Sequence, residues 1–326
     1  MMRRDKERVV MSFSTETKTE LSRIVPEKKC CMLAEIAGFL RVSGSLRLAG
    51  GGKFKVVITT DSPAVARQYK KLIKEYFQVE TELEIGEAAA LKKGYTYMLT
   101  IGPEMRSEQI LRETGILLVR EGNNFISDGI YDDLIRSKCC KKSYLRGIFM
   151  GSGTVSNPEK SYHLEIVCHS KPLANDLKKM INTFVDLSAK VVERKGKYIV
   201  YMKNSDYICD TLAIMGAHTQ LLEFENVKIK KELLNETVRI TNCDNANTDR
   251  TLDASQKQIV AIKRIEDAVG LGALPEKLQA AATLRLEYPE ASLVQLGEMM
   301  DPPMKKSGIN NRMKKILEFS EKLYKS

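Results

Sequence analysis

The first two thirds of the chain alternate between apolar residues at helical spacing and short β-branched or apolar runs bounded by turn formers. Helical periodicity predicts amphipathic helices, and the short runs predict strands. Pro63 and Pro172 stand near the expected starts of two helices, where the missing N–H of proline does no harm. Gly50-Gly51-Gly52 separates two strand-like segments and predicts a hairpin tip. The main predicted helices cover residues 34–40, 66–77, 144–150 and 174–185, and the main predicted strands cover residues 56–60 and 164–168.

The same order of residues and elements occurs twice, which indicates an internal duplication. Lys29-Cys30-Cys31 returns 109 positions later as Lys138-Cys139-Cys140. At the same spacing, Ser43-Gly44-Ser45-Leu46 corresponds to Ser152-Gly153-Thr154-Val155. Each copy reads helix, strand, strand, helix, strand, strand, helix. The sequence therefore predicts an α+β domain over residues 11–222, in which αββαββα halves 11–120 and 121–222 are related by a pseudo-twofold axis.

One apolar helix in each copy has a glycine at its centre, Gly38 in the first and Gly147 in the second. A glycine inside a helix costs about 1 kcal/mol relative to alanine. Its presence in both copies predicts that two helix backbones approach each other closely at these residues.

The last third of the chain has helical periodicity only. We predict a helix over residues 223–240 and turns over the Asn-rich residues 241–248, since Asn favours turns and caps. Residues 223–254 would then be a linker of helix and loop, and residues 255–326 an all-α domain. The first helices of that domain are expected at residues 255–270 and 275–288.

A short turn separates the last two predicted helices. Ser292 is a good N-cap for a helix over residues 293–300, and Asp301-Pro302-Pro303 ends that helix because proline cannot continue it. Ser307 is the candidate cap of the final helix. Helix, short turn and helix near residues 292–320 are typical of a helix-turn-helix, whose second helix lies in the major groove of double-stranded DNA.

The final helix has an apolar stripe opposite a basic and amide-rich face. Ile309, Met313 and Ile316 belong to the stripe. Arg and Asn pair with guanine and adenine through two hydrogen bonds, and Lys also binds phosphates. The alternative is a solvated amphipathic helix, because most basic faces bind nothing, and residues 292–326 have an excess of only three positive charges. The candidate DNA-binding residues are Lys306, Ser307, Asn310, Asn311, Arg312 and Lys315.

Composition places the chain among ordinary globular proteins, with 43% hydrophobic residues and a net charge of +10. The charge permits an anionic partner such as nucleic acid without proving one. No apolar run reaches the roughly 18 residues of a membrane span, and residues 1–10 are a charged leader that we expect to be disordered. Seven cysteines without a secretion signal favour a reducing cytoplasm and free thiols.

The duplicated helices ending in Ser43-Gly44 and Ser152-Gly153 resemble those of the LAGLIDADG homing endonucleases. In that family the acid before the final glycine binds the catalytic divalent metal, and the resemblance maps it onto Ser43 and Ser152. A neutral hydroxyl replaces a carboxylate poorly, because metal-assisted phosphodiester cleavage needs anionic oxygen ligands. The earlier acid of the motif maps onto Arg41 and Met150. We therefore expect a degenerate domain with neither a metal nor another cofactor, and no catalytic activity.

The whole of residues 11–326 resembles the WhiA family, in which a degenerate LAGLIDADG-like domain precedes a C-terminal helix-turn-helix. The resemblance rests on segments such as residues 144–149, 242–247 and 307–312. It implies a sequence-specific DNA-binding regulator of sporulation, or of cell division and chromosome segregation, located in the cytoplasm with the nucleoid. The resemblance is also compatible with a protein partner, either another transcription regulator or RNA polymerase. Asn311 stands where many relatives are expected to have His.

Two alternatives stay open at this point. The first is a divergent LAGLIDADG nuclease or RNA maturase. The second is an interaction module that holds another regulator at promoters. Adjacent cysteine pairs also raise the idea of a metal site, but neighbouring side chains are expected to diverge, and buried thiols are the simpler interpretation.

Overall fold

The computed structural model describes residues 11–87 and 95–325, so the predicted leader 1–10 lies outside the described residues. The chain divides into two compact units, Met1–Lys230 and Lys231–Ser326. Each unit has its own hydrophobic core.

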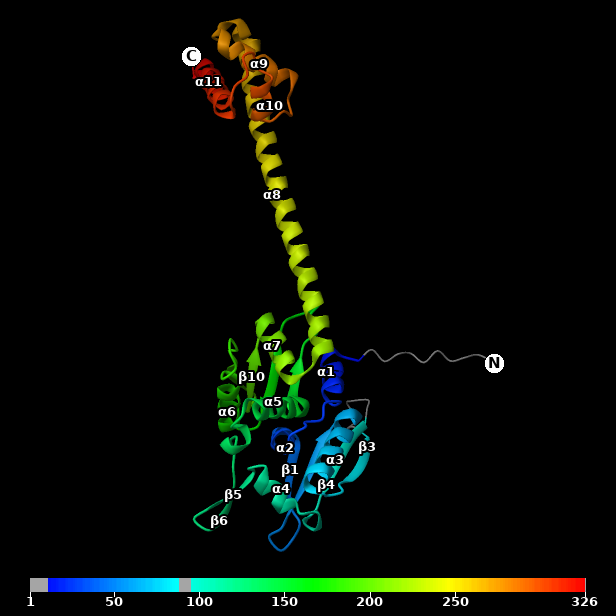
Figure 1. Cartoon of the computed structure of the whole chain (residues 1–326). Helices are drawn as coiled ribbons and strands as arrows, with labels where there is room; N and C mark the ends of the chain where they lie inside the picture. The colour runs from blue at the N-terminus through cyan, green and yellow to red at the C-terminus, as the bar shows by residue number, and fades with distance from the viewer. Residues whose placement is uncertain (1–10, 88–94, 326) are drawn as a thin grey trace, which may run out of the picture. The chain divides into compact units, whose positions relative to one another are not determined.

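The first unit consists of two halves with the same order of elements (Figure 1). Their four-stranded antiparallel sheets have the equivalent strand orders β1-β2-β4-β3 and β7-β8-β10-β9. This confirms the predicted duplicated αββαββα fold. The first half contains α2 (Lys29–Ser43), β1 (Gly44–Leu48), β2 (Phe54–Thr60), α3 (Pro63–Phe77), β3 (Glu82–Glu87), β4 (Tyr95–Ile101) and α4 (Ser107–Glu113). The second contains α5 (Lys138–Ser152), β7 (Gly153–Val155), β8 (Leu164–Cys168), α6 (Lys171–Ile181), β9 (Lys190–Arg194), β10 (Lys197–Met202) and α7 (Ser205–Met215).

Local sequence signals account for several of these boundaries. The Ser62 side chain caps α3, with Pro63 in the first turn, and Ser170 caps α6 in the same way. The three glycines Gly50, Gly51 and Gly52 all have positive φ at the tip between β1 and β2, as the predicted hairpin requires. Sequence analysis missed the leading helix α1 (Phe13–Leu21) and the hairpin of β5 (Leu117–Arg120) and β6 (Asn123–Ile126) that connects the halves.

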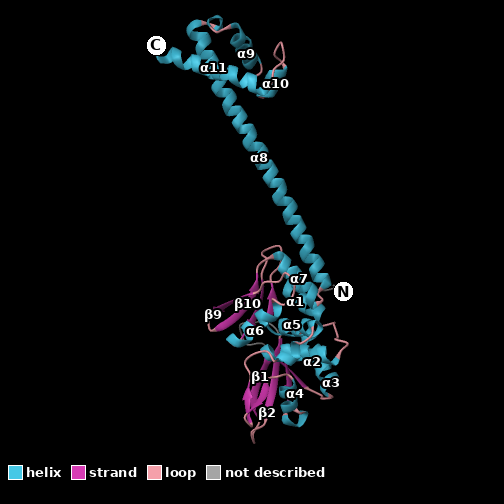
Figure 2. Cartoon of the chain, turned by 60° about the vertical axis from the view of Figure 1, so that its left-hand side comes forward, coloured by secondary structure: helices cyan, strands magenta, loops and turns pink. Residues whose placement is uncertain are grey.

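Helices α2 and α5 lie side by side in the centre of the first unit (Figure 2). A Cβ added to Gly38 would lie 2.4 Å from the carbonyl oxygen of Tyr144, and one added to Gly147 would lie 2.1 Å from that of Glu35. Neither position has room for a side chain, so the predicted close approach of two backbones is confirmed. The two glycines therefore set the distance between the helices, and with it the position of both helix ends.

Helix α8 (His218–Val269) is continuous through the Asn-rich residues, so the predicted loop at 241–248 is wrong. No Gly or Pro interrupts the chain between residues 218 and 269. Polar side chains that favour caps also fit a helix when they bond one turn back. Thr241 donates to the carbonyl oxygen of Thr237 at 3.0 Å, and Thr248 to that of Asp244 at 2.9 Å. The turn formers are thereby accommodated inside the helix.

The second unit is all-α, as predicted. Its core is formed by the last turns of α8, by α9 (Glu276–Glu287), by α10 (Leu293–Glu298) and by α11 (Lys306–Lys325). The 3₁₀ turn Leu271–Ala273 joins α8 to α9. Ile262 and Ile265 of α8 pack with Leu296 of α10 and Ile309 of α11, and all four are fully buried.

Candidate nucleic-acid interface

The start of α10 is fixed by a reciprocal pair of hydrogen bonds. The Ser292 hydroxyl accepts from the Gln295 backbone N–H at 3.3 Å, and the Gln295 side-chain oxygen accepts from the Ser292 backbone N–H at 2.8 Å. This capping box satisfies two donors that the first helical turn would otherwise leave unpaired. The predicted N-cap is confirmed.

The turn between α10 and α11 packs directly on Gly297. The Met304 backbone N–H donates to the Gly297 carbonyl oxygen at 2.8 Å, and a Cβ at Gly297 would lie 2.3 Å from the Met304 carbonyl oxygen. The angle between the two helices therefore depends on a residue without a side chain. Helix α11 begins at Lys306, so Ser307 lies in its first turn and is not its cap, which corrects the prediction.

Helix α11 has the two faces that the sequence predicts. Ile309, Met313 and Ile316 are at most 1% exposed and join the core. Of the six candidate DNA-binding residues, Lys306, Ser307, Asn311 and Lys315 are exposed, whereas Asn310 and Arg312 are half-buried at the edges of the polar face. The candidate residues therefore share one accessible side of α11, and Lys314 is exposed there as well.

Arg285 is a structural residue of this unit that sequence analysis missed. It lies on α9, is 1% exposed, and donates to the carbonyl oxygen of Ala291 at 2.6 Å. Longer contacts reach the Ser255 hydroxyl and the Pro289 carbonyl oxygen, both at 3.4 Å. These bonds hold the segment that leads into α10, and so they position the first helix of the pair. The sequence signal that could have identified Arg285 is an arginine on a helix face whose other residues are small or apolar.

Ser43 and Ser152, at the C-terminal ends of α2 and α5, are the positions that the LAGLIDADG resemblance maps onto metal-binding acids. The hydroxyl oxygens of Ser43 and Ser152 are both buried without a hydrogen-bond partner among the described residues. A Cβ on Gly151 would lie 2.6 Å from the Ser43 hydroxyl oxygen, so the two helix ends touch. Arg41, two positions before Ser43, donates to the carbonyl oxygens of Ser127 and Gly115. Neutral hydroxyls in place of carboxylates do not fit a hard divalent cation.

Helices α2 and α5 share a buried ion pair in which Arg146 donates to one Glu35 carboxylate oxygen at 2.6 and 2.9 Å. Arg146 also donates to the Met215 carbonyl oxygen at 3.0 Å. Burial raises the pKa of Glu35 to about 6, although Arg146 opposes this shift. The repeat in the sequence would set Tyr144 or Leu145 opposite Glu35, whereas the structure sets Arg146 there. Opposite charges on two apolar helices were the signal that could have identified the pair.

Three family models together cover most of the chain. The WhiA N-terminal LAGLIDADG-like domain matches residues 29–117, the WhiA LAGLIDADG-like domain matches residues 141–234, and the WhiA C-terminal HTH domain matches residues 237–320. A probable cell division protein WhiA from Alkaliphilus metalliredigens is 45% identical over 312 residues, which are 96% of this chain and 98% of the relative. The chain belongs to the WhiA family. A second relative with the same description, from Alkaliphilus oremlandii, is 47% identical over 315 residues, with the same two coverages of 96% and 98%.

A solved structure agrees with the family assignment. Full-length DUF199/WhiA from Thermatoga maritima aligns with a TM-score of 0.59 at 25% identity, and covers 96% of this chain and 99% of that one. The WhiA HTH model spans α10 and most of α11, where the candidate DNA-binding residues lie. In the described part of the chain, every helix is too short or too polar to cross a bilayer.

Proposed function

We propose that this member of the WhiA family is a sequence-specific regulator of transcription that binds double-stranded DNA through α11 and has no nuclease activity. The exposed basic and amide-rich face of α11, presented behind a capped α10 in a domain matched by the WhiA HTH model, carries the proposal. Relatives described as probable cell division proteins support genes of cell division as targets, and sporulation genes are included in the same proposal. Binding of DNA would place the protein with the nucleoid.

The residues of α11 divide by the contact that each can make. Asn310, Asn311 and Arg312 have side chains that can pair with base edges, whereas Lys306 and Lys315 suit phosphates. Ser307 in the first turn can donate to a phosphate beside the positive end of the helix. Specificity would therefore depend on the amides and Arg312, and the dependence of affinity on salt would depend on the lysines.

The test starts from a duplex that the full-length protein selects out of a random-sequence pool. Arg312→Ala should weaken binding of that duplex by about 1–3 kcal/mol, which is roughly 5- to 150-fold in Kd, while binding of random duplex changes little. Arg264→Ala is the matched control, because it removes the same charge from an exposed position on α8. If both variants lose the same affinity for the selected duplex, the loss comes from the change in net charge and not from a contact that Arg312 makes with a base. Failure to select any sequence would contradict the proposed function itself.

The absence of nuclease activity is proposed from the ends of α2 and α5. Two buried hydroxyls stand where the resemblance to LAGLIDADG endonucleases expects metal-binding acids, and a hydroxyl lacks the anionic oxygen that a hard divalent cation needs. In the binding experiment above, adding Mg²⁺ or Mn²⁺ should leave the selected duplex intact on a denaturing gel. Strand cleavage at a defined position by the pure protein would overturn this part of the proposal.

A further inference from the structure

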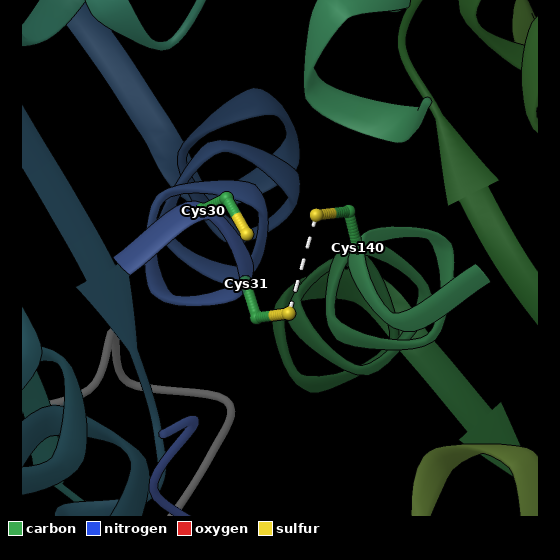
Figure 3. Close-up of side chains that lie close together, drawn as sticks. All are labelled: Cys30, Cys31 and Cys140. Carbon is green, nitrogen blue, oxygen red and sulfur yellow. Dashed lines mark hydrogen bonds between the residues drawn. The ribbon is translucent and has the colours of Figure 1, made fainter. Parts of the chain in front are cut away.

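Four cysteines lie together at the N-terminal ends of α2 and α5, far from the serines at the other ends. The sulfur atoms of Cys30, Cys31 and Cys140 are all within 4.8 Å of one another (Figure 3). The pair that faces across the two helices, Cys31 and Cys140, is 4.0 Å apart. Within residues 11–87 and 95–325, this is the only group of three Cys, His, Asp or Glu side chains with ligand atoms so close together.

Cys139 completes the set. It is the counterpart of Cys30 in the duplicated sequence, and its thiol interacts with those of Cys31 and Cys140. The inner pair, Cys31 and Cys140, is 6% exposed, whereas Cys30 is exposed and Cys139 is half-buried. The duplication thus places two inner and two outer thiols around the pseudo-twofold axis. The sequence-based objection that neighbouring cysteines diverge does not hold here, because Cys30 and Cys31 both direct sulfur toward Cys140 (Figure 3).

We propose that this cluster binds a thiophilic metal ion, Zn²⁺ first of all, through the thiolates of Cys30, Cys31 and Cys140. Cys139 or a water molecule takes the fourth position. A zinc–sulfur bond of about 2.3 Å implies sulfur atoms about 3.8 Å apart in a tetrahedral site. The distances of 4.0 Å and up to 4.8 Å therefore need only small side-chain adjustments. Sulfur ligands select soft or borderline ions over Mg²⁺ and Ca²⁺.

The surroundings act on these thiols in two opposite ways. Burial raises the pKa of Cys31 and Cys140, whereas the positive charge nearby favours the thiolates that a bound metal ion requires. Both α2 and α5 are 15 residues long and point their N-terminal ends, which have a partial positive charge, toward the sulfur atoms. Lys28 is close enough to act on the Cys139 thiol, and Lys29, Lys138, Lys141 and Lys142 flank the two cysteine pairs in the sequence. These positive charges would offset the net negative charge of a zinc ion with three or four thiolates.

An ion can reach the cluster from solvent. A cavity of about 570 Å³ is lined by Cys31 and Cys139, together with Lys142 and His218. Cys30, next to Cys31 on α2, is exposed. Once bound, the ion would join the first turns of α2 and α5, and so would clamp the two halves of the duplicated domain at the end opposite Ser43 and Ser152.

The experiment measures metal binding by full-length protein that has been reduced and stripped of metal. Titration with Zn²⁺ against a chromophoric chelator should give one ion per chain, and Cd²⁺ should produce a sulfur-to-metal charge-transfer band. Cys31→Ser and Cys140→Ser should lower Zn²⁺ affinity by more than the roughly 10–100-fold typical of losing a supporting neighbour. Cys30→Ser should do the same, and because Cys30 is exposed, this variant is expected to keep its fold.

Two matched controls lie outside the cluster. Cys168→Ser removes a buried thiol from β8, and Cys243→Ser removes an exposed thiol from α8. Both should bind Zn²⁺ like the unchanged protein, and circular dichroism reports the fold of every variant. Absence of stoichiometric Zn²⁺ and of the Cd²⁺ band would overturn the proposal. So would affinity that is unchanged by Cys30→Ser, or peptide mapping that finds Cys31 joined to Cys140 in a disulfide in protein isolated without added oxidant.

Discussion

Glu35 and Arg146 show how one residue on each central helix makes the two halves dependent on each other. A buried ion pair is weak evidence for net stabilisation, because desolvation of both charges offsets their attraction. Loss of one partner is different, since it leaves the other charge buried and uncompensated. The pair therefore selects the correct packing of α2 against α5 more than it adds stability.

Arg146→Met should destabilise the first unit by about 3–5 kcal/mol at neutral pH, measured by urea unfolding. The double variant Glu35→Gln, Arg146→Met should recover much of this loss, because no charge remains buried. The pKa of Glu35 is about 6 although Arg146 lowers it, so removal of Arg146 raises this pKa further, and the folded variant takes up a proton at a higher pH than the unchanged folded protein does. The penalty of Arg146→Met should consequently shrink at pH 5, whereas a penalty independent of pH would contradict this explanation.

Helix α10 has only six residues and depends on its cap more than a long helix does. A first turn without a side-chain cap leaves several backbone N–H groups unpaired. The capping box of Ser292 and Gln295 satisfies two of them, next to the segment that Arg285 holds. The first helix of the proposed DNA-binding pair is thus stabilised at its start by side chains and at its end by the Gly297 contact.

Ser292→Ala should therefore destabilise the second unit by about 1 kcal/mol, within the 0.5–2 kcal/mol found for lost N-caps. Ser307→Ala is the control, since Ser307 lies inside the first turn of α11 and is exposed. It should change stability by less than about 0.5 kcal/mol. Thermal unfolding followed by circular dichroism gives both values, and a larger effect of Ser307→Ala would mean that α11 is capped differently in solution.

Among residues 11–87 and 95–325, the structure has two hydrophobic cores that share no buried residue. One belongs to the duplicated domain and the other to the helical domain, and every residue from 232 to 254 on α8 is exposed. Burial of apolar surface is what makes unfolding cooperative, so an exposed helical stretch transmits little stability from one core to the other.

Scanning calorimetry of the full chain should accordingly show two transitions. Arg146→Met should lower only the transition of the first unit, and Ser292→Ala only that of the second. A single two-state transition, moved by both substitutions, would show that α8 couples the two cores. The two variants thus assign each transition without cutting the chain.

Much of this protein is determined by sequence alone, because the relevant physics is local or repeats along the chain. The 109-residue repeat gave the duplicated fold, serine and proline marked the starts of α3 and α10, and the apolar stripe of α11 defined its exposed face. The sequence alone also places neutral Ser43 and Ser152 where the LAGLIDADG resemblance expects metal-binding acids. Gly38 and Gly147 predicted that two helix backbones pack closely, because a glycine inside a helix is otherwise unfavourable.

Only the tertiary structure decided which distant residues meet. The 109-residue repeat aligns Glu35 with Tyr144, but the ion-pair partner is Arg146, two positions further on, because the rotation of α2 against α5 depends on the whole interface. The four cysteines likewise converge only through that packing. The Asn-rich residues 241–248 became helix because local turn preference is weak, and a helix without Gly or Pro propagates through it. Residue preferences act over a few positions. The ion pair and the cysteine cluster instead depend on contacts between residues more than a hundred positions apart in the sequence, and the conformation of residues 241–248 depends on a helix of 52 residues.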